Sequence, residues 1–353
     1  MLYNLPTKIG VLCCVFLYTT AVAQNDSDSL FESESVLDLK LSGSTRKLFN
    51  DRSDNAAYHP LRLSYKNADS SETRIEVAAK TRGNFRRKSA NCTYPPILLN
   101  FQNATIANTL FKNQKKVKLV VPCRGDKYVV REYLVYKLYN LITPKSYRAR
   151  LVKTTFSDSA KKEAVTFLSF LLEEDEQLAR RNGLKLQNKK MVQGEVTEKE
   201  TFLEMAVFQY MIGNTDWSVP YLHNIRILAF DSLTIPYVVP YDFDHAGIVD
   251  APYALPPEEL TLSSTHERRF RGYCITDLKA FEQTVATFNR LKKDIYNVYT
   301  SCSLLDAKYV AATVKYLDRF YETLNNPKQL KAEFTYPCNM ANPAIVIQGL
   351  GNK

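Results

Sequence analysis

The sequence predicts an α+β fold of two lobes, in which a β-rich lobe with one inserted helix is followed by a mainly helical lobe. Short apolar or alternating segments bounded by turn residues fill the first half of the chain, which is typical of strands. One segment there repeats its apolar residues at helical spacing and ends before Pro144. Long helical patterns dominate the second half. The order predicts a sheet lobe at 35–173, a linker at 174–195, a helical lobe at 196–335 and a tail at 336–353.

The β-rich lobe is expected to contain seven strands around the single helix. The helix is predicted in DKYVVREYLVYKLYNLI, where Val130, Leu134, Leu138 and Leu141 recur at helical spacing. The strands are predicted in VLDLKLSG, LRLSYK, TRIEVAAKTR, PILLNF, VKLVVP, ARLVKTTFS and AVTFLSFLLE.

The helical lobe is expected to open with a helix and a hairpin. The helix EKETFLEMAVFQYMIG closes on Gly213, a residue type that favours the left-handed backbone of a helix C-terminus. The strand-like segments HNIRILAF and IPYVVPYDF are joined by the turn DSLT into a hairpin. Two long helices follow at about 277–297 and 304–325.

The N-terminus has the features of an export signal. Lys8 provides a positive start, residues 9–23 form a short apolar run, and Ala21 and Ala23 supply an A-x-A cleavage site. We expect a signal peptide at 1–23 and a flexible, acidic leader at 24–34, with no transmembrane span in the mature chain. The protein would then be periplasmic, on the cell surface or extracellular. An uncleaved anchor is the alternative, although the apolar run is short for a membrane span.

Cysteine number and net charge narrow the class of protein. Five of the seven cysteines follow the predicted signal, so one thiol stays free or pairs between chains. No two of the five have zinc-finger spacing. The net charge of +10 favours anionic partners, but the basic residues are dispersed and no nucleic-acid-reading motif accompanies them. We therefore expect phosphorylated small molecules or acidic surfaces as partners, and no specific nucleic acid.

Two aspartates at the end of the predicted hairpin form a candidate metal site. Asp242 and Asp244 stand two residues apart in PYDFDHAG, and side chains two apart share one face of a strand. Their like charges repel unless a cation or a proton lies between them. A hard ion such as Mg²⁺ or Mn²⁺ prefers carboxylate and amide oxygens and would relieve this repulsion. The alternative is a solvated turn in which an aspartate caps the residues that follow.

The segment GNTDWSVPYLHN adds two polar side chains to this site. Asn224 begins the first strand of the hairpin beside the end of the second, so its amide oxygen is predicted as a third metal ligand. Asp216, in the preceding loop, is predicted to face a substrate hydroxyl as a general base or orienting group. An Asx-turn after a helix is the alternative for this loop.

The two neighbouring histidines suggest a second interpretation. With the aspartates, His223 and His245 would form a nitrogen and oxygen site for a transition metal, as in a phosphoester hydrolase. Each histidine, however, alternates to the strand face opposite its neighbouring candidate ligand. Packing or hydrogen bonding is therefore the expected role of both.

Four segments resemble, in this order, the spore-coat protein H (CotH) kinase family, an atypical branch of the protein-kinase-like fold found in exported proteins. KTRGNFRRKS resembles the family's R-G-N-S segment, and VPYDFDHAG resembles its P-W-D-x-D-G segment. The resemblance covers about residues 75–250 and implies a two-lobed, atypical protein-kinase-like fold. Its segments are 80–89, 116–141, 216–228 and 239–247.

The resemblance implies an activity and assigns roles to the candidate residues. It implies transfer of the γ-phosphoryl group of ATP to a hydroxyl of a protein acceptor, with Mg²⁺ or Mn²⁺ as the metal. Asp216 would be the catalytic aspartate. Asn224 and Asp242 would hold the metal, with Asp244 adjacent.

The chain departs from the family at three places. Asp216 and Asn224 stand further apart than in the D-x-x-x-x-N of the usual kinase catalytic loop. Tyr241 and His245 replace the family's Trp and Gly. The strand segment YPPILLNF contains no lysine, so the family's phosphate-binding lysine has no counterpart there.

Two other cations are predicted to contact phosphate in place of that lysine. They are Arg82, at the end of one strand, and Lys118, within another. Glu132, on the inserted helix, is predicted to pair with such a cation as the helix glutamate does in kinases. Solvated strand residues and a surface ion pair are the alternatives. At the level of function, the alternatives are a catalytically inactive kinase-like binding protein and a metal-dependent phosphoester hydrolase.

Overall fold

The computed structural model describes residues 29–338 apart from residues 103 and 162. The predicted signal peptide at 1–23 lies outside the described residues, as do residues 339–353 of the predicted tail. The described helices are α1 (Ser29–Glu32), α2 (Thr45–Asn50), α3 (Asp126–Ile142), α4 (Asp175–Arg181), α5 (Lys199–Ile212), α6 (Glu282–Thr300), α7 (Ala307–Asn325) and α8 (Pro327–Phe334), with short 3₁₀ helices at Gly194–Val196, Glu258–Leu260, Leu278–Phe281 and Tyr336–Cys338.

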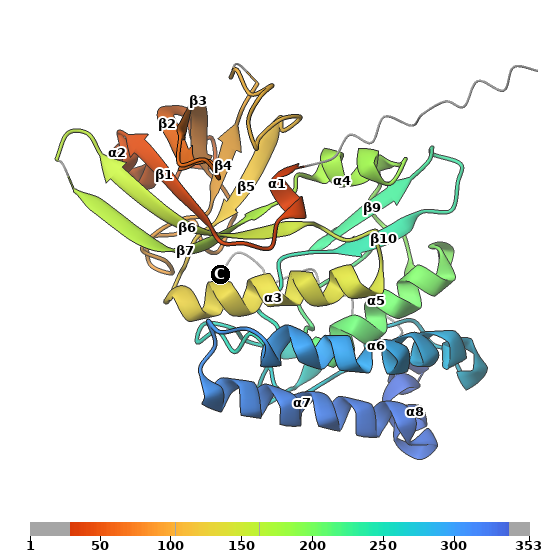
Figure 1. The fold of residues 1–353 in the computed structure, drawn as a ribbon. Coiled ribbons are helices and arrows are strands. Elements are labelled where there is room, and N and C mark those ends of the chain that lie inside the picture. The colour runs from red at the N-terminus through yellow and green to blue at the C-terminus, as the bar shows by residue number, and fades with distance from the viewer. Residues whose placement is uncertain (1–28, 103, 162, 339–353) are drawn as a thin grey trace, which may run out of the picture.

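Seven strands form a closed barrel in the order β1, β2, β3, β4, β5, β7, β6 (Figure 1). β1 pairs in parallel with β6, and all other neighbours in the barrel pair antiparallel. In β1, Leu37, Leu39 and Leu41 are buried and alternate with exposed Asp38 and Lys40. Inward apolar side chains of this kind from all seven strands fill the barrel. The strands are β1 (Leu37–Gly43), β2 (His59–Lys66), β3 (Glu72–Thr81), β4 (Ile97–Asn100), β5 (Lys116–Val120), β6 (Ala149–Asp158) and β7 (Ala164–Leu172).

The closed barrel corrects the fold predicted from the sequence. The two-lobed, atypical kinase-like fold is wrong, because the strands of the first half close on one another through the parallel pair of β1 and β6. Each strand lies where its apolar pattern predicts it. The pattern does not say which strand pairs with which, and the register that places Leu37 opposite Val152 joins segments far apart in the chain.

Helices pack in layers beneath the barrel. α3 follows β5 and packs against β6 and β7 on one side and against α6 on the other. Figure 1 shows α3, α6 and α7 one below another. α3 and α5 bury residues around most of their circumference, whereas α6 and α7 each bury a single face. None of the helices in the described part of the chain is long and apolar enough to cross a membrane.

A second, three-stranded sheet carries the predicted hairpin. β8 (Lys185–Gln187), β9 (Ile225–Ala229) and β10 (Tyr237–Pro240) pair antiparallel in the order β10, β9, β8. The hairpin of β9 and β10 is confirmed, with Ile225 opposite Pro240. The segment predicted as a linker contains α4 and β8.

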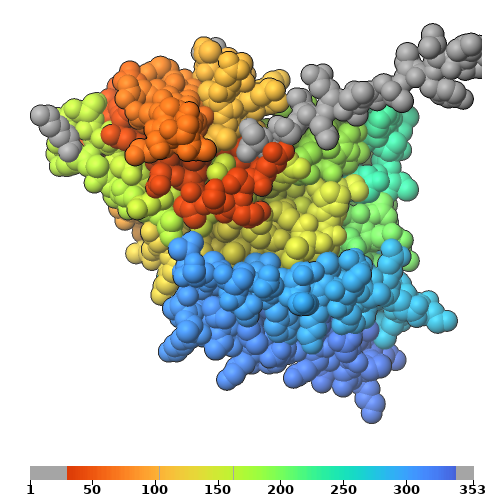
Figure 2. All heavy atoms as spheres, in the orientation of Figure 1, coloured from red at the N-terminus to blue at the C-terminus, as the bar shows by residue number. Residues whose placement is uncertain are grey.

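The first described residues differ from the flexible leader predicted at 24–34. α1 places Leu30 and Phe31 in the interior. The Arg150 guanidinium donates hydrogen bonds to the Leu30 and Ser35 carbonyl oxygens, at 3.1 and 3.3 Å. In Figure 2 the red atoms of this segment lie against the yellow atoms that include α3. Residues 29–34 are thus part of the packed structure, because two apolar residues in an otherwise polar stretch dock on the barrel.

Two disulfides join loops that the sequence could not pair. Cys92 bonds to Cys123, and Cys274 bonds to Cys338. Cys302 is the free thiol within the described part of the chain. The prediction that an odd number of exported cysteines leaves one unpaired agrees with this pairing. The first disulfide ties the loop after β3, which contributes Arg82 and Arg86 to the site described next, to the loop before α3, the helix that carries Glu132.

Candidate functional site

The loop that follows α5 positions Asp216. α5 ends at Ile212, and Gly213 turns the chain with a left-handed φ of 67°. A side chain at this position would collide with the Tyr316 hydroxyl and the Thr265 carbonyl, so the turn requires glycine. Asn214 then accepts a hydrogen bond from the Asp216 main-chain N–H at 3.1 Å. This local geometry places Asp216 in a buried position just beyond the helix.

Both carboxylate oxygens of Asp216 accept hydrogen bonds. His223 Nε2 donates to Oδ1 at 2.8 Å, and Asn224 Nδ2 donates to Oδ2 at 3.0 Å. Asn224 Nδ2 also reaches the Asp216 carbonyl at 2.8 Å. On the other side, the Arg271 guanidinium donates to the Thr215 and Trp217 carbonyls. Asp216 is therefore held in one orientation by groups on two segments.

The hairpin brings Asp242 beside this pair. The Tyr241 main-chain N–H donates to the Asn224 carbonyl at 3.0 Å, which continues the pairing of β9 and β10 by one residue. Asp242 follows, with a left-handed φ of 61° and its N–H bonded to the Tyr136 hydroxyl at 2.9 Å. Its side chain is 51% exposed and accepts no hydrogen bond from the described residues. Its carboxylate is therefore the accessible one of the group.

The prediction that Asp242 and Asp244 share one face of a strand is wrong. β10 ends at Pro240, and the left-handed backbone at Asp242 breaks the alternation. Asp244 turns into the interior, where its Oδ2 accepts a hydrogen bond from Arg86 Nε at 2.7 Å. The predicted metal ligand Asp244 is thus committed to a buried ion pair.

Arg86 is the centre of the buried electrostatic network. Its Nη2 donates to Glu132 Oε2 at 2.6 Å and lies 3.9 Å from Asp242 Oδ1, while its Nε binds Asp244. Three carboxylates therefore surround one guanidinium. Glu132 does form an ion pair from its helix, as predicted, but its partner is neither Arg82 nor Lys118.

The excess of carboxylates shifts their pKa values apart. Burial raises the pKa of Glu132 to about 8 against the opposing charge of Arg86. For Asp244, burial acts in the same direction, but Arg86 outweighs it and holds the pKa below its ordinary value. The pKa of Asp242 is raised by reduced solvation and by the nearby charge of Asp244. Half of the Asp242 side chain is exposed, so the like charge of Asp244 acts on it together with the partial loss of solvation.

The two predicted phosphate-binding cations lie in different surroundings. Lys118 is buried, pairs with Asp175 and lies over the Tyr147 ring at 4.9 Å. Burial lowers the pKa of Lys118, and Asp175 opposes this shift. Arg82 is half-buried, and its guanidinium makes no hydrogen bond or ion pair with a described residue. It nevertheless lies near enough to Asp242 to lower the pKa of that carboxyl.

Neither histidine is placed like a ligand of a shared metal. His223 binds Asp216, which matches the expected hydrogen-bonding role. His245 is buried against the Phe85 and Tyr253 rings, with centroids 5.8 and 5.7 Å away, and its Nδ1 has no hydrogen-bond partner among the residues that the structure describes.

Sequence reasoning missed Arg86 and the pair of Asp175 with Arg226. Arg86 lies in a loop, where no periodic pattern marks a residue as buried, although it belongs to the segment KTRGNFRRKS that carries the resemblance. Asp175 lies in the segment predicted as a linker, yet it joins Lys118 to Arg226, whose Nε lies 2.6 Å from its Oδ2. No signal in one sequence identifies such pairs, because their members are distant in the chain.

The residues of the site can supply a small number of oxygen ligands to one hard cation. The Asn224 side-chain oxygen accepts no hydrogen bond from a described residue, because the amide nitrogen faces Asp216. Together with the exposed Asp242 carboxylate, it provides the oxygen donors that Mg²⁺ and Mn²⁺ prefer. No cluster of three or more His, Cys, Asp or Glu side chains suited to a metal occurs in the described part of the chain. Such an ion would therefore take few protein ligands and keep positions for water or substrate oxygens.

Comparisons with known proteins add no assignment. Searches against protein-family models and against curated proteins find no match to this chain.

The raised pKa of Glu132 predicts that stability falls as pH rises. Between its ordinary value of 4.5 and about 8, the folded state keeps a proton that the unfolded state releases. The unfolding free energy therefore decreases as pH increases through this window. Asp244, whose pKa is lowered, changes stability only at more acidic pH.

Urea unfolding at several pH values, with a chelator present, measures this dependence. We expect Glu132→Gln to flatten the profile in part, because the amide does not titrate, while Asp242, whose pKa is also raised, keeps its own contribution. Glu76→Gln, at an exposed strand position, is the matched control and should leave the profile unchanged. Identical profiles for the wild-type protein and Glu132→Gln would contradict the shift.

Proposed function

We propose that the protein transfers a phosphoryl group from a nucleotide such as ATP to a protein hydroxyl in a metal-dependent reaction. One observation carries the proposal. Buried Asp216 is hydrogen-bonded to Asn224, and the Asn224 carbonyl is bonded to the residue preceding the exposed Asp242. A base, an amide oxygen and a carboxylate thus converge from a loop and a hairpin, which is the combination that phosphoryl transfer requires.

The backbone conformation sets the direction of two of these side chains. Asn224 and Asp242 both have left-handed φ angles, 50° and 61°. Asn and Asp adopt this conformation more readily than other residues with a side chain. Under the proposal, Asn224 Oδ1 and the Asp242 carboxylate hold Mg²⁺ or Mn²⁺. When bound, this ion would neutralise charge on the phosphate oxygens.

The other residues of the site have distinct proposed roles. Asp216 orients the acceptor hydroxyl and accepts its proton, while His223 and Asn224 keep the carboxylate in place. Arg82, with an uncommitted guanidinium near Asp242, is the proposed phosphate contact. Lys118 is held by Asp175 and is the weaker candidate. Arg86 and Glu132 hold the 240–247 segment in position through Asp244 and do not contact the nucleotide.

The resemblance to the CotH kinase family supports the same assignment of Asp216, Asn224 and Asp242, although the fold it implied does not hold. The predicted signal peptide and the two disulfides support export to an oxidising compartment. The acceptor is then expected to be another exported protein.

Thermal unfolding of the protein from Gln24 onward tests nucleotide and metal binding. We expect Mg²⁺ or Mn²⁺ with ATP to raise the melting temperature, because a ligand at a hundred times its Kd stabilises by about 2.7 kcal/mol. Asp242→Asn should abolish the metal-dependent part of the shift. Asp294→Asn, at an exposed position on α6, is the matched control and should retain it.

The possible outcomes separate the three functions. A metal-dependent ATP shift that Asp242→Asn removes supports phosphoryl transfer. The absence of a shift at millimolar ATP in a folded sample overturns it and leaves a binding protein. A shift with a transition metal alone, lost on His223→Ala, would instead select the phosphoester hydrolase.

A further inference from the structure

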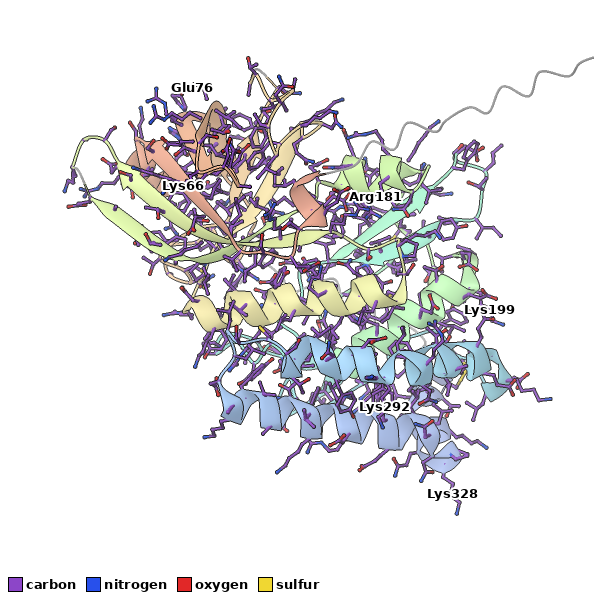
Figure 3. All side chains as sticks on the ribbon, in the orientation of Figure 1. Lys66, Glu76, Arg181, Lys199, Lys292 and Lys328 are labelled. Carbon is purple, nitrogen blue, oxygen red and sulfur yellow. A yellow bond between two sulfur atoms is a disulfide. The ribbon has the colours of Figure 1, made fainter. Side chains whose placement is uncertain are left out.

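A pocket of about 250 Å³ lies at the C-terminal end of α3. Asn140 on its wall is eight residues beyond Glu132, which corresponds to about 12 Å along a helix axis. The pocket opens between α1, the end of α3, the start of β6 and the end of α4, where Figure 3 labels Arg181. Its walls are formed by Phe31, Lys137, Asn140, Pro144, Ser146, Arg148, Ala149 and Arg181.

Three of these wall residues are cations, and they differ in how far they are neutralised. Arg181 is bound through Nε and Nη2 to the fully buried Glu173, at 3.0 Å each. Lys137 Nζ pairs with Glu34 Oε1 at 2.5 Å. The Arg148 guanidinium makes no hydrogen bond or ion pair with any residue that the structure describes. The pocket therefore holds one uncompensated guanidinium beside two partly compensated cations.

Glu34 marks the kind of group that the pocket attracts. Its side chain is 66% exposed, and its two oxygens bind Lys137 and, at 3.2 Å, the Tyr133 hydroxyl. The exposed Glu34 carboxylate thus pairs with Lys137, one of the cations of the pocket wall. Because an exposed ion pair contributes little stability, a ligand with more negative charge can displace it.

We propose that this pocket binds a small tetrahedral dianion, the phosphate group of a phosphorylated small molecule. The planar guanidinium of Arg148 donates two parallel hydrogen bonds to such a group, and Lys137 adds a point charge. Asn140 uses its amide nitrogen on Ser146 and the Tyr147 carbonyl, so its amide oxygen remains to accept a hydrogen bond from a ligand hydroxyl. The volume exceeds that of a phosphate alone, which leaves room for the attached part of the ligand.

Calorimetric titration with inorganic phosphate, in a metal-free buffer above neutral pH, tests the site. We expect Arg148→Gln to weaken phosphate binding by about tenfold or more, because the free guanidinium is its main contact. We expect Glu34→Gln to tighten binding several-fold, because the competing carboxylate is removed. Opposite effects from two variants cannot both arise from loss of folding.

Three further titrations define the ligand and the location. Arg82→Gln should bind phosphate as the wild-type protein does, which separates this pocket from the proposed nucleotide site, where Arg82 is the phosphate contact. Sulfate should bind like phosphate, and acetate should bind at least about tenfold more weakly, since it carries one charge. Glu76→Gln, which removes an exposed carboxylate elsewhere, should leave the affinity unchanged.

Several results would overturn the proposal. They are an absence of binding at millimolar phosphate, a phosphate affinity that Arg148→Gln leaves intact, an equal affinity for acetate, and loss of binding in Arg82→Gln. Unchanged affinity in Glu34→Gln would also contradict it, because displacement of that carboxylate is part of the binding step.

Discussion

Replacing Asp216 with asparagine is expected to lower the rate of phosphoryl transfer about 10²- to 10⁴-fold, the usual contribution of a positioned general base. Asparagine has nearly the same shape, so it fits the buried position between His223 and Asn224. Its amide, however, cannot accept the proton of the acceptor hydroxyl. The measurement is incorporation of labelled phosphate from ATP into a protein acceptor in the presence of Mn²⁺.

Two comparisons make this result specific. Asp294→Asn makes the same chemical change on the exposed face of α6 and should retain full activity. His223→Gln should cost less than Asp216→Asn, because it removes only an orienting hydrogen bond. If the Asp216→Asn protein is folded, binds metal and ATP, and keeps wild-type activity, Asp216 is not the base.

Replacing Arg86 with alanine is expected to lower the unfolding free energy by about 3–5 kcal/mol, which is the cost of removing one partner from a buried ion pair. Asp244 and Glu132 are both buried and would lose the guanidinium that they share. Urea unfolding monitored by fluorescence measures the change. Arg74→Ala, which breaks an exposed pair with Glu72, should cost less than about 1 kcal/mol.

A further set of variants tests whether charge is the cause of this loss. Adding Asp244→Asn to Arg86→Ala should restore part of the lost stability, because it removes a carboxylate that would otherwise remain buried without a partner. A triple variant combines Arg86→Ala, Asp244→Asn and Glu132→Gln. If it is no more stable than the Arg86→Ala protein, lost packing rather than charge explains the effect.

The local elements were predictable because each depends on residues close in sequence. The apolar spacing around Val130 and Leu134 located α3, and Gly213 marked the end of α5. The turn between β9 and β10 predicted their pairing, because a hairpin is the shortest connection two strands can have. The barrel could not be predicted this way, because its closure depends on the pairing of β1 with β6, which lie far apart in the sequence.

The site was predictable in part for the same reason. Asp216 and Asn224 belong to one loop, and the hairpin register places Asn224 beside the residue before Asp242. The role of Asp244 was not predictable, because the left-handed backbone at Asp242 reverses the expected direction of its side chain. Lys118 lies on the predicted strand, but its partner Asp175 lies in the segment predicted as a linker.

Local sequence patterns were sufficient to locate the seven barrel strands, the helices α3, α5, α6 and α7 and the hairpin of β9 and β10, but not α1, α2, α8 or β8. They also located the loop and the hairpin that carry the polar candidates, and the number of cysteines predicted one unpaired thiol. These features follow from periodicity, turn chemistry and counting, which act over a few residues at a time. Three features depend on the tertiary structure. Seven strands close into a barrel, Arg86 binds Glu132 and Asp244, and Lys118 has a partner whereas the Arg82 guanidinium has none among the described residues. Burial and charge pairing depend on which distant segments of the chain contact one another, and a local sequence pattern does not contain that information.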